Sequence, residues 1–569
     1  MPSRLTACVM AALLATTMAT PAMAQFQDAI TPAAPAPAET IYINGHIATP
    51  DGWRTALALG KGTILAIGNE AQMSAHRTAA TRVVDLGGKT VLPGLIDMHV
   101  HAVDAGLHAR ECAFPQGSAA PAVVAAVKAC VEAAKPGAWV VGGQWDASSL
   151  GKVAPHRRIL DAIAPKVPVV LHDISLHSVW ANSAALAAAG IDRKTPNPAG
   201  GVIERDSKGE PTGILRENAA ILLLNKVPSP SDEDRVAALR QATQAMLAQG
   251  ITAYEEALMA TANARAYAAL ADTGGLAQHV RTCMWDSDQG LITQRHLYAR
   301  PGLDVSCIKM ILDGVPTESH TAAMHDPYAD AAAFGDASRA KGSLIIAPEA
   351  IKQRLTRYDA AGLTVKLHAA GDASVHAALD AITAARKANG AYGPHHEIAH
   401  GNFILPADIG RARDLGATFE FSPYIWFPSP PVQDLYHTVG AERMARFTPV
   451  REALDAGARV VIGSDWPVVP SMSPWVAIET LVTRETPGGG ATSLAPSQKV
   501  SVAEALRMMT VSAAMQLGVG DKVGTLEPGR QADFIVIDRD IFAIPPREIH
   551  ATKVLLTVIA GKEAYLANP

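Results

Sequence analysis

The chain has 569 residues, 49% of them hydrophobic, which is enough to bury one large core or several domains. Its 54 acidic and 49 basic residues give a formal net charge of -5. This balance, without any basic run, argues against nucleic-acid binding, so no nucleic-acid partner is expected.

Residues 1–24 have the three parts of a secretory signal peptide. Arg4 precedes an apolar stretch at residues 5–18, and the small residues Ala22 and Ala24 frame a cleavage site. The apolar stretch is short for a membrane span, so we expect an exported protein, periplasmic or secreted, without a stable membrane anchor. Residues 25–39 are rich in Ala and Pro and are expected to form a leader segment.

Four cysteines remain when the signal peptide is removed. Cys112 and Cys130 are close in sequence, and an exported protein permits disulfides, so we predict that these two pair. Cys283 and Cys307 lie in apolar strand-like runs, where free thiols of the core are the expectation and pairing is left open.

Short strand-like runs occur near both ends of the chain. They are residues 40–47, 56–67, 82–86, 532–538 and 554–559. Because they enclose a middle of different character, we predict one small β-sandwich domain built from residues 40–90 and 522–569.

The middle of the chain, residues 91–521, alternates apolar strand-like runs with Ala-rich helical stretches, which is typical of β/α units. The first strand is the run at residues 90–92, which leads into PGLIDMHVH at 93–101. Seven more are residues 250–257, 277–285, 305–312, 363–368, 395–400, 417–424 and 459–465. Eight units predict a TIM-like (β/α)8 barrel, with a large insertion at residues 107–248 after the first strand.

Several of these strands end in side chains that can bind metal. His99 and His101 are two residues apart, so on a strand they point to the same side. Other strands carry or end in Lys309, His368, His400 and Asp465. Because strand ends converge on one cup in a barrel, four histidines and a carboxylate there predict a site for one or two Zn²⁺-like ions.

These stretches resemble the amidohydrolase superfamily of metal-dependent hydrolases, especially its amidohydrolase 3 branch with YtcJ-like proteins and N-substituted formamide deformylases. In the barrel the resemblance rests on VLPGLIDMHVH at 91–101, IKMILDG at 308–314, VKLHAAGDASVHAALDAI at 365–382, HHEIAH at 395–400 and VVIGSDWPV at 460–468. Outside the barrel it rests on PVVLHDISLHSVWANSAAL at 168–186, AGGVIERDSKGEPTGIL at 199–215 and VGTLEPGRQADFIVIDRD at 523–540.

The resemblance implies a role for each candidate ligand. It assigns the more buried metal to His99, His101 and Asp465, and the second metal to His368 and His400. Asp465 is also the implied general base, taking a proton from the attacking water and passing it to the leaving nitrogen.

Lys309 occupies the place where relatives carry a lysine that is carboxylated by CO₂ and bridges two metals. Two Zn²⁺ ions per chain are then expected, with Mn²⁺, Co²⁺ and Fe²⁺ as alternatives. An unmodified Lys309 would indicate a single-metal site instead. In relatives a Glu often precedes the histidine matched by His400, whereas this chain has Ala399 there.

The insertion is expected to shape the substrate pocket. His177, Trp180 and Asn182 match the family pattern His-x-x-Trp-x-Asn, and His177 is the best candidate for substrate contact. Trp145 is a second candidate wall, and His320, after the strand that carries Lys309, is expected to face the cup. The alternative is that the residues of the insertion anchor it to the barrel.

Together these patterns predict an exported metal-dependent hydrolase that cleaves a C–N bond, most simply an amide, of a small-molecule substrate. Two alternatives stay open. One is hydrolysis of a cyclic amide, ester or lactone, or deamination, in the same cup. The other is a binding or regulatory barrel without catalysis, because fold does not fix function. The substrate cannot be read from the sequence, and a homodimer remains open.

Overall fold

The computed structural model describes residues 35–115, 117–145, 149–150, 153–173, 178–198, 201–317, 320–333, 340–425, 427–469 and 471–568. The predicted signal peptide and most of the predicted leader lie outside these residues. From Pro37 onward the chain forms one compact unit. Within the described ranges, no helix combines the length and the apolar character that crossing a membrane requires.

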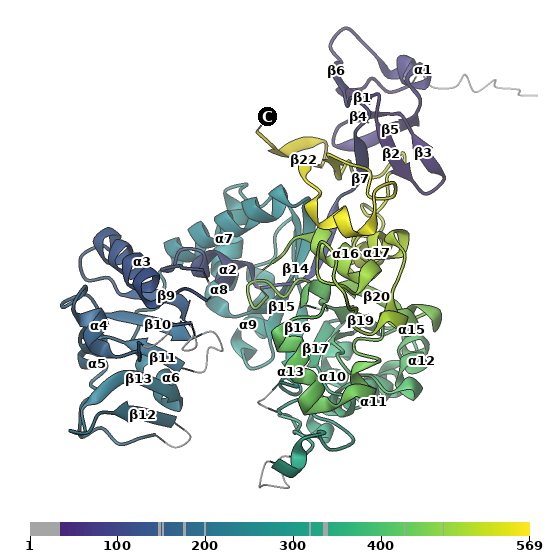
Figure 1. Cartoon of the computed structure of the whole chain (residues 1–569). Coiled ribbons are helices and arrows are strands. Elements are labelled where there is room, and N and C mark those ends of the chain that lie inside the picture. Colours follow the sequence, from purple (N-terminus) through teal and green to yellow (C-terminus); the bar gives the residue numbers. More distant parts are fainter. Residues whose placement is uncertain are drawn as a thin grey trace, which may run out of the picture. The chain divides into compact units, whose positions relative to one another are not determined.

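The central element is a sheet of eight strands in the order β20-β19-β18-β17-β16-β15-β14-β8 (Figure 1). These strands are β8 (Leu95–Val100), β14 (Ile251–Met259), β15 (His279–Trp285), β16 (Leu303–Ile311), β17 (Thr364–Ala369), β18 (Glu397–His400), β19 (Thr418–Phe421) and β20 (Arg459–Ile462). Every neighbouring pair is parallel. At the remaining seam, the N–H of His101 donates to the carbonyl of Trp466 at 2.9 Å, and the N–H of Asp465 donates to the carbonyl of His99 at 2.7 Å. The predicted barrel is confirmed.

Helices follow or precede the barrel strands and cover them from outside. They are α7 (Asp232–Ala248), α8 (Thr261–Asp272), α9 (Gln289–Gln294), α10 (Pro348–Ala360), α11 (Asp372–Asn389), α12 (Pro406–Leu415), α15 (Val450–Asp455), α16 (Pro474–Thr483), α17 (Val502–Met508) and α18 (Val511–Leu517). Helix α11 shows why they form: Val375, Leu379 and Ile382 recur at helical spacing and are fully buried. It ends at Gly390, whose φ of 114° suits glycine.

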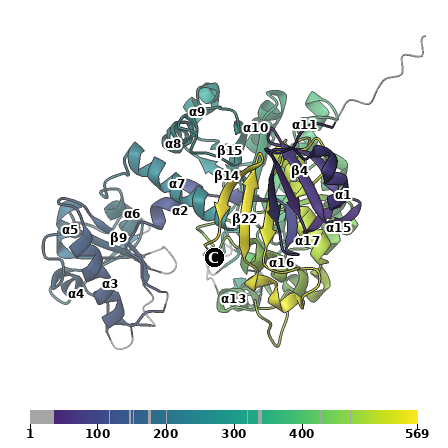
Figure 2. The same cartoon turned by 90° about the horizontal axis from the view of Figure 1, so that it is seen from above.

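The segments near the two chain ends form two smaller sheets. One has the order β5-β4-β1-β6 and the other β23-β22-β21-β7-β2-β3. The strands are β1 (Thr40–Ile43), β2 (His46–Thr49), β3 (Gly52–Arg54), β4 (Ala56–Gly60), β5 (Thr63–Gly68), β6 (Arg82–Asp85), β7 (Thr90–Pro93), β21 (Phe534–Ile537), β22 (Val554–Ile559) and β23 (Lys562–Leu566). Figure 2 shows the purple and yellow strands side by side. One core joins both sheets, with Tyr42 and Leu57 packed among the same residues as Phe534 and Val558.

The apolar run at residues 90–92 is not the first barrel strand that its pattern predicts. It belongs to β7, which pairs with β21 and β2, and the barrel strand β8 begins at Leu95. Gly94 separates the two strands, and a Cβ atom there would lie 2.1 Å from Oγ1 of Thr252. The chain therefore passes from one sheet to the other at the only residue type that fits this close approach.

The segment between β8 and β14 contains a five-stranded sheet in the order β12-β13-β11-β10-β9. Its strands are β9 (Val140–Trp145), β10 (Val169–Asp173), β11 (Ser178–Ala181), β12 (Gly201–Arg205) and β13 (Pro211–Glu217). Besides α7, the helices of this segment are α2 (Ala102–His108), α3 (Ala120–Ala133), α4 (Arg157–Asp161), α5 (Ser183–Ala188) and α6 (Asn218–Leu224). Two hydrophobic clusters of its own fill the space around this sheet.

Both cysteine pairs form disulfides. Cys112 and Cys130 are bonded, as predicted. Cys283 and Cys307, whose pairing the sequence left open, are also bonded and are not free thiols. The physical reason is register: the two residues are direct partners on the adjacent strands β15 and β16, with their Cα atoms 4.1 Å apart. The register between these two strands cannot be read from spacing alone.

Candidate metal centre

Three of the predicted ligands meet where β8 and β20 end. Oδ1 of Asp465 lies 3.3 Å from Nε2 of His101 and 3.5 Å from Nε2 of His99. Each of the three residues offers one ligand atom, and these three atoms all lie within 4.8 Å of one another. Two imidazoles and a carboxylate at such distances are a donor set that suits a divalent cation.

The other predicted ligands surround the same point. The ring centroid of His400 lies 5.0 Å from that of His99 and 4.3 Å from that of His368. Nζ of Lys309 lies 3.4 Å from Nε2 of His99. The structure therefore brings the six residues predicted to bind metal into one cup at the strand ends.

Hydrogen bonds decide which nitrogen each histidine offers. Nε2 of His368 donates to the carbonyl of Gly314 at 3.0 Å, which leaves Nδ1 with the lone pair. Nδ1 of His99 lies 2.5 Å from Oε2 of Glu420, so His99 offers Nε2 when Glu420 accepts this proton. Burial lowers the pKa of His99 and His400 well below the ordinary value, which keeps both imidazoles neutral, as metal binding requires.

Two of the ligand positions have a backbone conformation that L-residues rarely adopt. The φ angle is 74° at His400 and 59° at Asp465. His400 is the last residue of β18, and Asp465 comes three residues after the end of β20. Non-glycine residues in this region cost energy and are typical of functional sites, where the surrounding structure holds them in place.

Carboxylates lie behind both histidines of the first motif. Glu420 contacts His99, and Oε1 of Glu256 lies 3.8 Å from Nδ1 of His101. Burial raises the pKa of Glu420 to about 8, against the opposing charges of Lys366 and Lys309, and that of Glu256 to about 7. A cation among the histidines would favour the ionised form of both carboxylates.

Two buried lysines of the barrel have opposite environments. Lys366 lies among three glutamates, whose charges outweigh the cost of burial and raise its pKa. Lys309 is buried beside histidines, and burial together with the charge of Lys366 lowers its pKa to about 8. Lys366 is therefore a fixed cation, whereas Lys309 is the lysine that can lose its proton near neutral pH.

A cavity of about 430 Å³ opens over the ligands. Its described lining combines metal-site residues with mostly apolar side chains: His99, His101, Leu258, Lys309, Ile311, Val315, Pro316, Thr317, His368, Ala370, His400, Asn402, Ser422, Leu435, Phe447, Asp465, Val468 and Val469. Among these residues, the charged side chains are Lys309 and Asp465, both at the metal site. The cavity therefore suits a small molecule with an uncharged apolar group.

Three predicted substrate contacts lie elsewhere. Trp145 and Trp180 are 4% and 0% exposed in the core of the insertion, with their rings in edge contact at 6.1 Å. Asn182 is fully buried and caps α5, where its side chain accepts from the N–H of Ala185. These three residues are not in the described lining of the cavity. They pack inside the insertion, which favours the alternative that they have a structural role.

The two remaining candidates have different outcomes. His177 lies outside the described residues. His320 is described, and its Nε2 lies 3.0 Å from Oδ2 of Asp330, with its ring against Tyr328. It is not among the described residues that line the cavity.

Sequence reasoning missed Glu256, Lys366 and Glu420. A signal was present, because each is a charged residue within a buried barrel strand, as in TFEF at residues 418–421. A charge buried in this way must find a partner.

A parallel β/α barrel with histidines and an aspartate at its strand ends defines a class of metal-dependent hydrolases. Comparison with known proteins narrows this class. A family model described as "Amidohydrolase family" matches residues 82–565. The chain therefore belongs to the amidohydrolase family of metal-dependent hydrolases, and the predicted resemblance is confirmed.

Individual relatives match over nearly the whole chain. The N-substituted formamide deformylase of Arthrobacter pascens is 30% identical over 93% of this chain and 98% of its own. The putative amidohydrolase YtcJ of Bacillus subtilis is 27% identical over 93% and 99%. An uncharacterized metal-dependent hydrolase from Pyrococcus furiosus has a similar solved structure, with a TM-score of 0.71 and 24% identity over 88% of this chain and 99% of that one.

Proposed function

We propose that this protein is an exported hydrolase that cleaves the amide C–N bond of a small, uncharged molecule. The observation that carries this proposal is the donor set of His99, His101 and Asp465 at the base of an apolar cavity. The similarity to an N-substituted formamide deformylase supports an amide as the bond that is cleaved.

We assign the residues of the cup different roles in binding metal and in moving a proton. His99, His101 and Asp465 would hold one divalent ion, and His368 with His400 a second, with Zn²⁺ as the proposed metal. Bound there, such ions supply a Lewis acid for the carbonyl oxygen and lower the pKa of water. Asp465 would take the proton of the attacking water and deliver it to the leaving nitrogen.

Lys309 is proposed to carry a carboxylate added by CO₂. An ammonium group has no lone pair for a cation, whereas a carbamate offers two oxygens. Two observations support this: Nζ lies 3.4 Å from the ligand atom of His99, and burial lowers the pKa of Lys309 to about 8. The amine that reacts with CO₂ is therefore available near neutral pH.

Export is proposed from two features. The predicted signal peptide at residues 1–24 would direct the chain out of the cytoplasm. The two disulfides fit an oxidising compartment such as the periplasm. Mass spectrometry of the mature N-terminus tests this, and a mature protein that retains Met1 would contradict it.

A panel of neutral N-alkyl and N-aryl amides, including formamides, tests the function. Metal-loaded protein should release the amine from at least one of them, and chelation should stop the release. Matched esters, lactones and exocyclic amines in the same panel test the alternative reactions. A metal-loaded, folded protein without activity on any of these compounds would overturn the proposal.

A further inference from the structure

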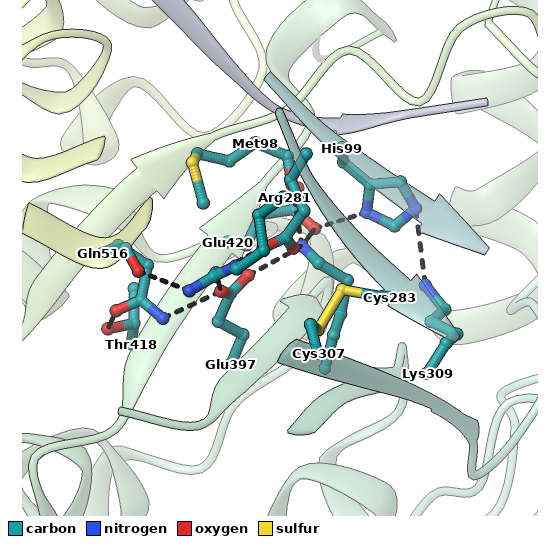
Figure 3. Close-up of polar contacts among 12 residues, drawn as sticks. Met98, His99, Arg281, Cys283, Cys307, Lys309, Glu397, Thr418, Glu420 and Gln516 are labelled. Atoms are coloured by element: carbon teal, nitrogen blue, oxygen red, sulfur yellow. Dashed lines mark hydrogen bonds and ion pairs between the residues drawn. A yellow bond between two sulfur atoms is a disulfide. The ribbon is translucent and has the colours of Figure 1, made fainter. Parts of the chain in front are cut away.

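Five charged side chains meet inside the barrel, and Figure 3 shows three of them, Arg281, Glu397 and Glu420, near His99. They are Glu255 on β14, Arg281 on β15, Lys366 on β17, Glu397 on β18 and Glu420 on β19. The glutamates and Lys366 are fully buried, and Arg281 is 4% exposed. We call these residues the interior charge cluster. Charges buried to this extent are stable only when each has partners, so the contacts of each member matter.

Lys366 connects five strands through one ammonium group. Its Nζ lies 2.8 Å from the carbonyl of Met98, 2.7 Å from Oε2 of Glu397 and 3.0 Å from Oε1 of Glu255. The carbonyl of Met98 accepts a hydrogen bond from Nζ, and Glu255 and Glu397 form ion pairs with it. Oε2 of Glu420 accepts a longer hydrogen bond from Nζ, at 3.5 Å. The acceptor on β8 is the carbonyl of the residue directly before His99.

Glu420 differs from the other two glutamates in what it faces. Glu255 and Glu397 each contact both Arg281 and Lys366. Glu420 contacts Lys366 on one side and Nδ1 of His99, at 2.5 Å, on the other (Figure 3). It is therefore the member of the cluster that connects the fixed cation to a candidate metal ligand.

We propose that Lys366 and Glu420 are positioning residues for the metal centre, acting in series on His99. Glu420 accepts the proton of Nδ1, which leaves the lone pair of His99 on Nε2, facing Asp465 at 3.5 Å. Lys366 donates to the carboxylate of Glu420, so it acts on the ring of His99 through Glu420. This inference rests on the proposed function, because positioning matters only if His99 binds a divalent ion.

The backbone of the opposite strand end is adapted to this arrangement. A Cβ atom at Gly463, directly after β20, would lie 2.2 Å from Cβ of His99 and 2.8 Å from Oε1 of Glu420. Only glycine lets β20 approach the histidine and its carboxylate this closely. His99 is 1% exposed and Glu420 is fully buried, so the pair is enclosed by the protein.

A double-mutant cycle on Zn²⁺ affinity tests the proposal. The variants are Glu420→Gln, Lys366→Met and the two combined, and the dissociation constant is measured by competition with a coloured chelator. Glu420→Gln should weaken Zn²⁺ binding about 10- to 100-fold, the usual effect of losing such a support. Lys366→Met should weaken it less, and should add nothing in the Glu420→Gln background, because Lys366 acts through Glu420.

The chain provides a matched control in another buried carboxylate–histidine pair. Oε2 of Glu479 lies 2.7 Å from Nδ1 of His550, and Glu479 is fully buried, outside the described lining of the cavity. Glu479→Gln should lower the melting temperature without changing Zn²⁺ affinity. Unchanged affinity in Glu420→Gln, or effects of the two variants that simply add, would overturn the series arrangement.

A second measurement covers variants of low stability. The rise in melting temperature on adding Zn²⁺ is read for each variant against its own metal-free form, and it should be smaller for Glu420→Gln than for Glu479→Gln. Suppose that the protein without substitutions binds Zn²⁺ tightly and that Zn²⁺ raises the melting temperature of Glu420→Gln by the same amount. The positioning role of Glu420 is then refuted, while the proposed function stands. If the unmodified protein binds no divalent ion, both proposals fail.

Discussion

Asp465 and His101 face each other across the seam of the barrel, with Oδ1 of Asp465 3.3 Å from Nε2 of His101. The backbone reinforces this relationship, because the N–H of Asp465 donates to the carbonyl of His99 at 2.7 Å. The first and last barrel strands thus hold the proposed general base against the two histidines of the HxH motif.

Asp465→Asn should abolish turnover while the protein stays folded. An amide cannot accept the proton of water, and it is a poorer metal ligand, so kcat should fall about 10³-fold or more. The measurement is kcat on the amide found in the panel, with circular dichroism and metal content on the same sample. Retained turnover in the folded variant would refute the role of Asp465.

Metal loading should depend on CO₂ and pH through Lys309. Its pKa is lowered to about 8, so the reactive neutral amine is scarce at pH 6, roughly 1% of the population, and reaches about half at pH 8. Bound Zn²⁺ per chain should therefore rise from pH 6 to pH 8 when bicarbonate is present. Lys309→Met should show no bicarbonate dependence. If the protein without substitutions binds as much Zn²⁺ without CO₂ as with it, Lys309 is not carboxylated.

The cavity should discriminate against charged substrates. Its described walls are mostly apolar, with Leu258, Leu435 and Phe447 among them, and no charged side chain beyond the metal site. The kcat/KM for a neutral amide should be at least 100-fold higher than that for its carboxylate-bearing analogue, because burying an unpaired charge is costly. Val468→Lys should raise the ratio of anionic to neutral turnover. Equal turnover of both analogues would contradict this view of the cavity.

Asn182→Ala should destabilise the insertion without raising KM. The Asn182 side chain donates to the carbonyls of Ala164 and Val167 and accepts from the N–H of Val169 and Ala185. Losing these buried hydrogen bonds should cost about 2–4 kcal/mol of unfolding free energy. Limited proteolysis and thermal melting would detect the loss. If the variant is stable and its KM is raised, Asn182 contacts the substrate, as its motif predicts.

The barrel, and the meeting of the candidate ligands at its strand ends, could be predicted from the sequence because they depend on local order. Each ligand follows an apolar run, and parallel strands bring such positions to one end whatever the loops between them. The insertion was read less well. Trp180 and Asn182 match a family pattern, yet whether such residues face a substrate or a core depends on distant strands that spacing does not reveal.

Neighbour relations between strands explain the other differences. Cys283 and Cys307 pair because β15 and β16 are adjacent in register, and Glu420 on β19 contacts His99 from a distant part of the chain. The break at Gly94 is also set by a contact with Thr252 from another strand. In each case the sequence contains the residue but not its partner.

The most direct test is to titrate Zn²⁺ into metal-free protein while measuring bound metal and hydrolysis of the neutral amide panel. The account predicts that amine release rises with bound metal and levels off at about two ions per chain. Hydrolysis that proceeds equally well without metal, or its absence at full loading, would contradict the account.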